Sequence, residues 1–188
     1  MKLPKGGGAP VLYLDFDGVL HHHDVRWRKK GGAYLEPAGF TLFEHAQLLE
    51  DWLRPYPQVR IVLATSWVVR YHCYRAARRL PEALRARVIG GTYHSHVAGA
   101  DEDERQAYGG RRRNPRVDAF CAKPRGVQVA EDAQRRKPSA WFALDDDDEN
   151  WPASSRSCLV KTDPALGLSA PDIAGKVAEH LQRICAQR

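Results

Sequence analysis

The sequence has little of what a membrane-spanning or exported chain needs. A helix that crosses a bilayer requires about 20 consecutive apolar residues, whereas the longest apolar stretch, near residues 11–20, is interrupted by Asp15 and Asp17. The first ten residues, MKLPKGGGAP, contain lysines but no apolar segment of the kind found in a secretory signal. We therefore expect residues 1–10 to be a flexible lead-in, and we expect a cytoplasmic protein with no membrane partner.

Cysteine is also scarce, with four in 188 residues, and no two of them form a CxxC pair. This spacing argues against both a zinc site and a disulfide framework. The formal net charge is +6 at pH 7. A basic balance favours an anionic partner without specifying which one.

Short apolar runs alternate with helical patterns along the chain, which predicts an α/β fold. A chain of 188 residues can bury a sizeable core in one domain but is short for two, so residues 11–188 are assigned to a single domain. We expect a Rossmann-like three-layer sandwich around a central, mainly parallel five-stranded sheet. Its strands are predicted at residues 11–14, 59–64, 87–89, 140–144 and 158–160.

Helix-start signals and apolar spacing locate the main helices. Thr41 and Glu44 form a capping-box pattern, in which each side chain satisfies a free amide at the start of a helix. Residues 68–80 form a basic helical pattern, and residues 125–136 predict a further helix. Near the end of the chain, Ser169 is expected to cap a last helix with an apolar inner face.

Polar side chains follow three of the predicted strands. Asp15 and Asp17 come directly after the first strand, Thr65 and Ser66 after the second, and a run of aspartates from Asp145 after the fourth. Functional groups of an open α/β sheet gather where the strands end at their carboxyl edges. Carboxylates from two strands can jointly hold Mg²⁺, a hard cation that prefers oxygen ligands. The pattern therefore predicts a magnesium site at this edge of the sheet.

Four segments together resemble the motifs of the haloacid-dehalogenase-like (HAD) superfamily of phosphohydrolases. They are DFDGV at residues 15–19, ATS at 64–66, a lysine before the fourth strand, and ALDDDDENW at 143–151. The small-cap layout, the tryptophan after the aspartates and the late TDPALGL are similar to bacterial HAD domains associated with RNA repair, the "Swiss Army Knife" group. A second aspartate in DxD implies phosphatase rather than dehalogenase chemistry.

The resemblance implies a role for each catalytic position. Asp15 is the expected nucleophile, which forms an aspartyl-phosphate and so divides one difficult displacement into two easier ones. Asp17 is the expected acid and base, protonating the leaving oxygen and then activating water. Thr65 is expected to hydrogen-bond a phosphoryl oxygen, and Lys123 to offset negative charge. Lys137 is the alternative lysine, but it lies three residues before the fourth strand, where a turn is expected.

The same resemblance implies the Mg²⁺ ligands. Asp145 is expected to bind the ion directly, with Asp146 as a ligand or supporting partner. Asp15 contributes its carboxylate, and Asp17 contributes its backbone carbonyl.

Four further residues are predicted to contact the substrate or its phosphate. Gly18 permits a tight backbone path beside the carboxylates, and Ser66 can replace Thr65 if the register differs by one. His21 is the histidine of the HHH run closest to the site. Arg113 represents the basic residues of the segment 90–124, which we expect to be an irregular basic insertion.

The substrate is the least determined part of the prediction. The insertion 90–124 is too short and irregular for a full cap domain, so the site is expected to stay open to a bulky substrate. Arginines can bind phosphates and aromatic rings can stack on bases, which favours RNA or DNA ends. A phosphoprotein or a small phosphometabolite is the second possibility, and a non-catalytic HAD module that binds nucleic acid or protein is the third.

Overall fold

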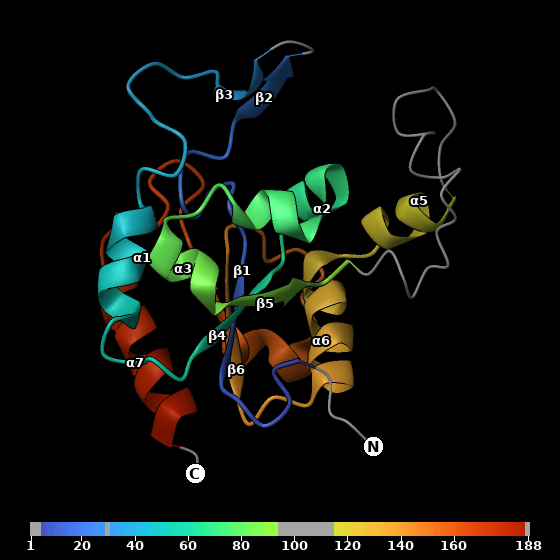
Figure 1. The fold of residues 1–188 in the computed structure, drawn as a ribbon, viewed down its shortest axis with the longest axis vertical. Helices are drawn as coiled ribbons and strands as arrows, with labels where there is room; N and C mark the ends of the chain where they lie inside the picture. The colour runs from blue at the N-terminus through green and yellow to red at the C-terminus, as the bar shows by residue number, and fades with distance from the viewer. Residues whose placement is uncertain (1–4, 29–30, 94–114, 187–188) are drawn as a thin grey trace.

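A five-stranded, all-parallel sheet forms the centre of the protein in the computed structural model, which describes residues 5–28, 31–93 and 115–186 (Figure 1). The strand order is β5-β4-β1-β6-β7. The strands are β1 (Val11–Leu14), β4 (Arg60–Leu63), β5 (Val88–Gly91), β6 (Trp141–Asp145) and β7 (Leu159–Lys161). The predicted α/β sandwich is confirmed, and each of the five predicted strands matches one of these within about two residues at either end.

The central strand β1 is buried along its whole length. All four of its residues are buried, as expected for a strand with neighbours on both sides and helices on both faces. Tyr13 pairs in register with Val62 of β4 and with Ala143 of β6. Because β1 lies between β4 and β6, the three segments that follow these strands emerge side by side at one edge of the sheet.

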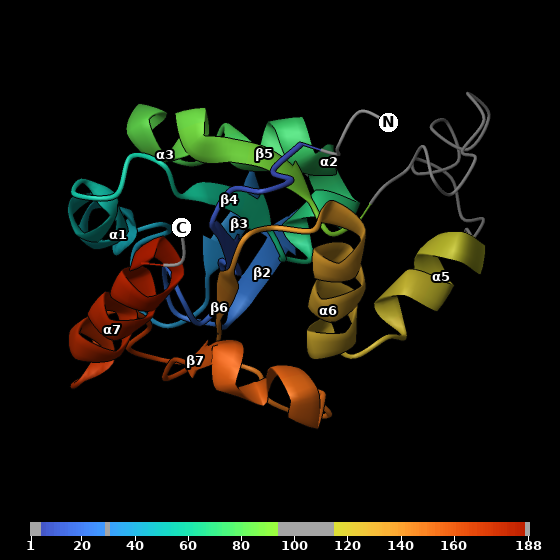
Figure 2. The ribbon, with the colours of Figure 1, turned by 90° about the horizontal axis from the view of Figure 1, so that it is seen from below.

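Helices cover both faces of the sheet (Figure 2). On one face the core includes side chains of α1 (Ala46–Leu53), α2 (Trp67–Ala77), α3 (Glu82–Arg87) and α7 (Ile173–Ala186). On the other face, α6 (Arg125–Arg136) packs against a smaller apolar cluster. No helix among the described residues is long and apolar enough to cross a membrane.

A buried polar network attaches α6 to the sheet. The Tyr13 hydroxyl donates to Asp132 (3.0 Å), and Arg136 Nε donates to the same carboxylate (2.6 Å). Arg136 also donates to the backbone carbonyl of Lys5 (2.8 Å), and the Gly8 amide donates to the carbonyl of Lys137 (3.0 Å). Lys5 and Gly8 of the predicted lead-in are therefore hydrogen-bonded to the end of α6.

A short antiparallel hairpin follows β1 and is absent from the sequence prediction. It consists of β2 (Val25–Arg28) and β3 (Gly32–Leu35). The signal was present, because Val25 and Trp27 alternate with arginines and the strands are separated by a glycine-containing turn. The hairpin and α1 occupy the stretch between β1 and β4, which agrees with the minimal cap expected there.

Two predicted helix starts are wrong. The backbone at Thr41 and Glu44 forms a turn, and α1 begins at Ala46 because Phe43 adopts a positive φ of 63°. The Phe43 ring packs edge-on against Phe16 (5.2 Å between centroids), so tertiary packing overrides the local capping pattern. Ser169 does not cap α7 either: its hydroxyl donates to the Leu166 carbonyl (2.7 Å).

The segment 90–124 is more regular at its ends than predicted. Gly90 and Gly91 belong to β5, and Pro115–Cys121 form the helix α5. Residues 94–114 lie outside the described residues, and Arg113 is among them. A 3₁₀ helix, η1 (Ala153–Cys158), joins the loop after β6 to β7.

The late TDPALGL segment supports the turn that follows β1. The Thr162 hydroxyl donates to the Gly18 carbonyl (2.7 Å), and the Leu168 amide donates to the Val19 carbonyl (3.0 Å). Gly167 has a φ of +53°, and a Cβ there would lie 2.3 Å from the Val19 oxygen. The segment therefore holds the first aspartate motif in place by donating hydrogen bonds to the backbone carbonyls of that motif.

We predict that Gly167→Ala destabilises the fold by about 1–3 kcal/mol, because the new methyl group would collide with backbone at a positive φ. Gly175→Ala, in α7 where no atom lies within 4 Å of a new Cβ, is the matched control and should stabilise the protein by up to about 1 kcal/mol. Urea denaturation measures both. Equal stability of Gly167→Ala and the parent protein would contradict the supporting role of this segment.

Candidate active site

Three carboxylates converge at the carboxyl edge of the sheet. Asp15 follows β1, Asp145 ends the neighbouring strand β6, and Asp146 follows it. One oxygen from each of the three lies within 4.8 Å of the other two. The oxygen donors and the short separation fit a hard divalent cation such as Mg²⁺. Three of the four predicted ligand residues are therefore brought together.

Burial makes the negative charge of this cluster costly. Desolvation, opposed by the Arg125 guanidinium and reinforced by the Asp17 carboxylate, raises the pKa of Asp15 to about 7. Burial and then the charge of Asp15 raise the pKa of Asp145 well above its usual range, and burial raises that of Asp146. A site of this kind needs positive charge if its carboxylates are to stay ionised at neutral pH.

Arg125 supplies positive charge from within the protein. Its Nη2 lies 3.6 Å from Asp15 Oδ2, and its Nε lies 3.5 Å from Asp145 Oδ2. Burial alone lowers the pKa of this guanidinium, but the two carboxylates more than reverse the effect and raise it. The sequence analysis does not single out Arg125.

The position of Arg125 depends on how α6 begins. Arg125 is the first residue of the helix and follows Pro124. At the next position, a Cβ on Gly126 would lie 2.6 Å from the Trp151 ring, so only glycine allows this close approach. Trp151 is itself fixed by its indole N–H, which donates to the Ser155 carbonyl (3.1 Å). The tryptophan after the aspartate run therefore packs against the first turn of α6, which carries Arg125.

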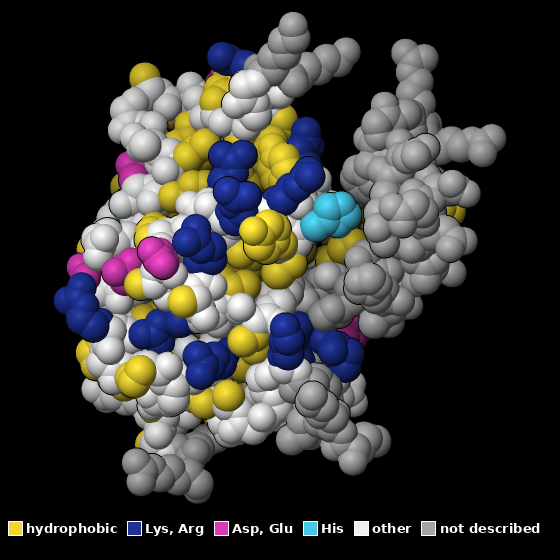
Figure 3. Space-filling view, in the orientation of Figure 1, with side chains coloured by type: hydrophobic (Ala, Val, Ile, Leu, Met, Phe, Trp, Pro, Cys, Tyr) yellow, Lys and Arg dark blue, Asp and Glu magenta, His cyan; other side chains and the backbone are white. Residues whose placement is uncertain are grey.

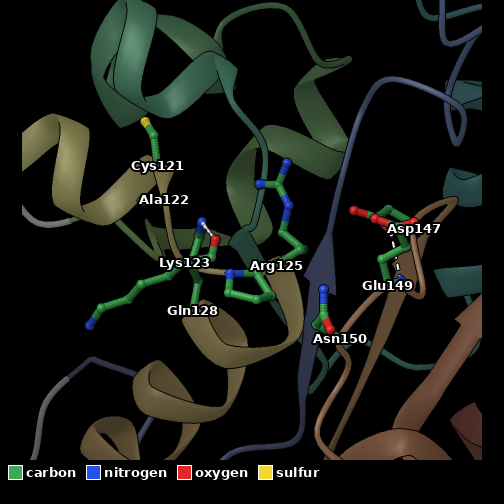
Figure 4. Close-up of a pocket in the computed structure, with 9 residues that line it drawn as sticks. Cys121, Ala122, Lys123, Arg125, Gln128, Asp147, Glu149 and Asn150 are labelled. Carbon is green, nitrogen blue, oxygen red and sulfur yellow. Dashed lines mark hydrogen bonds between the residues drawn. The ribbon is translucent and has the colours of Figure 1, made fainter.

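The two lysines considered for the same role lie elsewhere. Lys123 Nζ forms an ion pair with Glu131 (2.8 Å), and its side chain extends away from Arg125 and Asp147 (Figure 4). Lys137 lies at the opposite end of α6, where it caps the helix in a left-handed conformation. Within the described part of the chain, the cation beside the carboxylates is thus Arg125, and the role assigned to Lys123 is not supported by its contacts.

A polar cavity of about 340 Å³ adjoins Arg125. Figure 4 shows its walls, which come from the start of α6 on one side and from the loop after β6 on the other. Lys123, Arg125 and Gln128 line the first side, whereas Asp147 and Glu149 line the second.

Asp17 is held apart from the three-carboxylate cluster. Its Oδ1 accepts a hydrogen bond from the Trp67 indole N–H (2.8 Å) and lies 3.0 Å from His21 Nε2. The Phe43 amide donates to His21 Nδ1 (3.3 Å), so that nitrogen carries no proton and Nε2 is the donor to Asp17. The prediction that the Asp17 carbonyl contacts the metal stays a prediction.

The histidine run divides into separate roles. His21 is fully buried, so it positions Asp17 and has no surface for the substrate contact that was predicted. His22 stacks on His23 (4.6 Å between centroids) and lies against Phe40 (4.7 Å). His23 also contacts the Pro164 carbonyl (3.1 Å from Nδ1). His21 therefore supports the motif that precedes it, whereas His22 and His23 pack against each other, against Phe40 and against the Pro164 carbonyl.

The remaining predicted residues follow the two central strands. Gly18 has a φ of +68°, and a Cβ there would lie 2.3 Å from the Asp146 carboxyl group. Thr65 is buried two residues after the end of β4, and its hydroxyl oxygen accepts from the Trp67 amide (3.4 Å). Ser66 is exposed at the start of α2. Their roles toward a phosphate stay predictions, as does that of Arg113.

We predict that Asp15→Asn stabilises the protein in metal-free buffer, and that its advantage grows as the pH rises from about 4 to 7. The folded state of the parent protein binds the Asp15 proton more tightly than the unfolded chain does, because burial raises this pKa to about 7. As the pH rises above the pKa that Asp15 has in the unfolded chain, the parent protein therefore loses stability. The loss ends once the pH exceeds the pKa of Asp15 in the folded protein. For one group the slope is at most about 1.4 kcal/mol per pH unit.

Urea denaturation at several pH values measures this difference, and Asp51→Asn, on the exposed side of α1, is the control that should show none. Addition of Mg²⁺ at pH 7.5 should raise the melting temperature of the parent protein more than that of Asp145→Asn. An Asp15→Asn advantage that is constant or shrinks between pH 4 and 7 would contradict the buried-charge account.

The comparisons with known proteins agree with this arrangement. No curated protein and no solved structure matches the chain. Residues 11–173 match the family described as HAD domain in Swiss Army Knife RNA repair proteins. This span includes both strands that deliver the carboxylates, α6 with Arg125, and the supporting TDPALGL segment. The chain therefore belongs to the HAD domain family of the Swiss Army Knife RNA repair proteins and is, at that level, a HAD-type phosphohydrolase.

Proposed function

We propose that the protein is a Mg²⁺-dependent phosphatase that works through an aspartyl-phosphate and acts on the phosphorylated end of a nucleic acid. The observation that carries this proposal is the cluster of Asp15, Asp145 and Asp146 beside Arg125, with Asp17 held separately two residues after Asp15. The cluster provides a cation site next to a nucleophile, and the separate carboxylate provides an acid.

Asp15 is oriented for attack on phosphorus. The Phe16 amide donates to its Oδ1 (2.7 Å), which leaves Oδ2 on the side of Arg125. A new bond from Oδ2 to phosphorus replaces the bond to the leaving oxygen and forms the aspartyl-phosphate. Water then attacks the same phosphorus, which releases inorganic phosphate and regenerates the Asp15 carboxylate.

Asp17 transfers the proton in both half-reactions. His21 and Trp67 occupy its Oδ1, and no hydrogen bond reaches Oδ2 from the part of the chain that the structure describes. Oδ2 is thus available to protonate the leaving oxygen and, in the second step, to accept a proton from the attacking water. The two contacts at Oδ1 fix the direction in which Oδ2 points.

Positive charge beside the transferred group stabilises the transition state. Mg²⁺ held by Asp15, Asp145 and Asp146 would supply part of it by neutralising phosphoryl oxygens. Arg125 supplies a fixed guanidinium, 3.6 Å from Asp15 and 3.5 Å from Asp145. The buried Thr65, at the end of the neighbouring strand, is the candidate donor to a phosphoryl oxygen.

A nucleic-acid end is the substrate that the chain supports best. The family description refers to RNA repair proteins, and the sequence carries a net charge of +6. Between β1 and β4 there is only a small hairpin and one helix, so no large cap encloses the site there. A phosphoprotein or a small phosphometabolite is the alternative substrate, and a non-catalytic binding module is the alternative function.

The first test assays the purified protein with Mg²⁺ against RNA and DNA oligonucleotides bearing 5′ or 3′ phosphates, phosphopeptides and sugar phosphates. We expect phosphate release from an oligonucleotide end, lost on removal of Mg²⁺ and in Asp15→Asn but retained in Asp51→Asn. Turnover confined to sugar phosphates or phosphopeptides would contradict the substrate. Absence of metal-dependent turnover with every substrate would favour the binding module.

The second test asks which cation serves the reaction. Arg125→Ala should lower kcat by about 10²-fold, because it removes a fixed charge beside the nucleophile. Lys123→Ala should change kcat by less than about twofold, since it removes only an exposed ion pair. The steady-state rates of both variants measure the difference. A larger loss in Lys123→Ala than in Arg125→Ala would restore Lys123 as the functional cation.

A further inference from the structure

A basic and aromatic surface lies on α2, outside the carboxylate cluster. Residues 67–80, which comprise α2 and the turn after it, contain four arginines and no aspartate or glutamate. All four arginines are exposed. With two aromatic side chains beside them they form what we call the α2 surface, which consists of Trp27, Arg70, Tyr71, Arg75, Arg78 and Arg79.

Three arginines of this surface lie over aromatic rings. The guanidinium of Arg70 lies 4.2 Å from the ring centre of Trp27, which belongs to the β2–β3 hairpin. Arg79 lies 5.7 Å from the ring centre of Tyr71, and Arg78 lies 5.9 Å from that of Tyr74. Guanidinium groups and aromatic rings next to one another provide faces for nucleobases and charge for phosphates on one surface.

The charge of this surface is not neutralised within the described part of the chain. None of its four arginines forms an ion pair with a described carboxylate. Other exposed arginines do so: Arg54 pairs with Asp51, and Arg156 pairs with Asp148. Arginines concentrated on one helix without acidic partners create a positive potential that attracts an anionic ligand.

The surface is also hollowed. A cavity of about 430 Å³ is lined by Tyr71, Arg75, Arg78 and Arg79. Figure 3 shows Lys and Arg side chains interleaved with hydrophobic ones over the region that α2 occupies in Figure 1.

Side-chain contacts connect this surface to the catalytic motif. The indole N–H of Trp67 donates to Asp17. The ring of Trp67 lies 4.7 Å from that of Trp27 and 5.9 Å from that of Tyr71. Adjacent aromatic rings therefore connect Asp17, the predicted acid and base, to the arginines of the α2 surface. The path runs from Trp67 to Trp27 and Tyr71, over which Arg70 and Arg79 lie.

We infer that the α2 surface binds the single-stranded segment of the nucleic acid adjoining the phosphorylated end that reacts at Asp15. This inference rests on the proposed function, because it takes the carboxylate cluster as the place where the terminal phosphate lies. The arginines bind internal phosphates, and the aromatic and guanidinium faces stack on unpaired bases.

The surface chemistry favours a nucleic-acid strand over an anionic membrane. A membrane-binding face combines basic residues with exposed apolar side chains that enter the lipid. Among the described residues, the large hydrophobic side chains that are exposed are Leu48, Tyr74 and Leu166. Of these, Tyr74 alone lies on α2.

The test measures binding of a fluorescent single-stranded RNA oligonucleotide with a terminal phosphate by anisotropy at several salt concentrations. Asp15→Asn is the background, which prevents turnover. Arg75→Gln/Arg79→Gln should raise Kd by about tenfold or more and reduce the slope of log K against log salt by about 1.4, since each single-strand phosphate contact contributes about 0.7. Arg54→Gln/Arg60→Gln, which removes the same charge elsewhere, should leave Kd within about twofold. DNA strands, blunt duplexes, a phosphopeptide and anionic lipid vesicles complete the panel.

The parent protein and both double variants, each with Asp15 intact, are also assayed with para-nitrophenyl phosphate, a small ester that does not reach α2. Equal rates together with the selective loss of oligonucleotide binding sustain the inference. Equal oligonucleotide affinity in the two double variants would overturn it, as would preferential binding of vesicles or phosphopeptide. Loss of all phosphatase activity in the parent, with oligonucleotide binding still dependent on Arg75 and Arg79, would refute the proposed chemistry but leave the binding surface standing.

Discussion

Buried negative charge at the carboxyl edge of the sheet is the constraint around which the protein is organised. Asp15 and Asp145 end adjacent buried strands, so the parallel pairing that builds the core also brings like charges together. Positive charge must balance them. Arg125 provides it from the first turn of α6, and the close contact of Gly126 with Trp151 sets where that helix begins. The strand pairing of the core therefore brings the carboxylates together, and the packing of α6 brings the arginine that balances their charge.

The turn after β1 shows how irregular backbone serves the same arrangement. Gly18 passes so close to Asp146 that no larger residue fits, and its carbonyl accepts the Thr162 hydroxyl from the far end of the chain. Phe43 adopts a positive φ and donates its amide to His21, which in turn donates to Asp17. Strained or tightly packed positions thus lie around the aspartate motif, where they orient side chains rather than extend a helix or strand.

The contacts of Trp67 connect the aspartate motif to the α2 surface. Trp67 begins α2, donates to Asp17 and packs on Trp27 of the hairpin. Through Trp67, the hairpin and α2 therefore connect the arginines and aromatic rings of the α2 surface to Asp17. The proposed nucleic-acid substrate fits a surface of this kind, because its affinity would come from contacts along the strand rather than from enclosure of a small molecule.

The sequence by itself determined the sheet, its main helices and the convergence of Asp15, Asp145 and Asp146, because apolar strand runs and the residues that follow them are local features. It did not determine which cation faces the carboxylates. Arg125 and Lys123 are two residues apart, and only the start of α6 against Trp151 directs one inward and leaves the other paired with Glu131. The tertiary structure alone decided the roles of His21 and Trp67, because their partner Asp17 is reached through packing between β1, the 40–45 turn and α2.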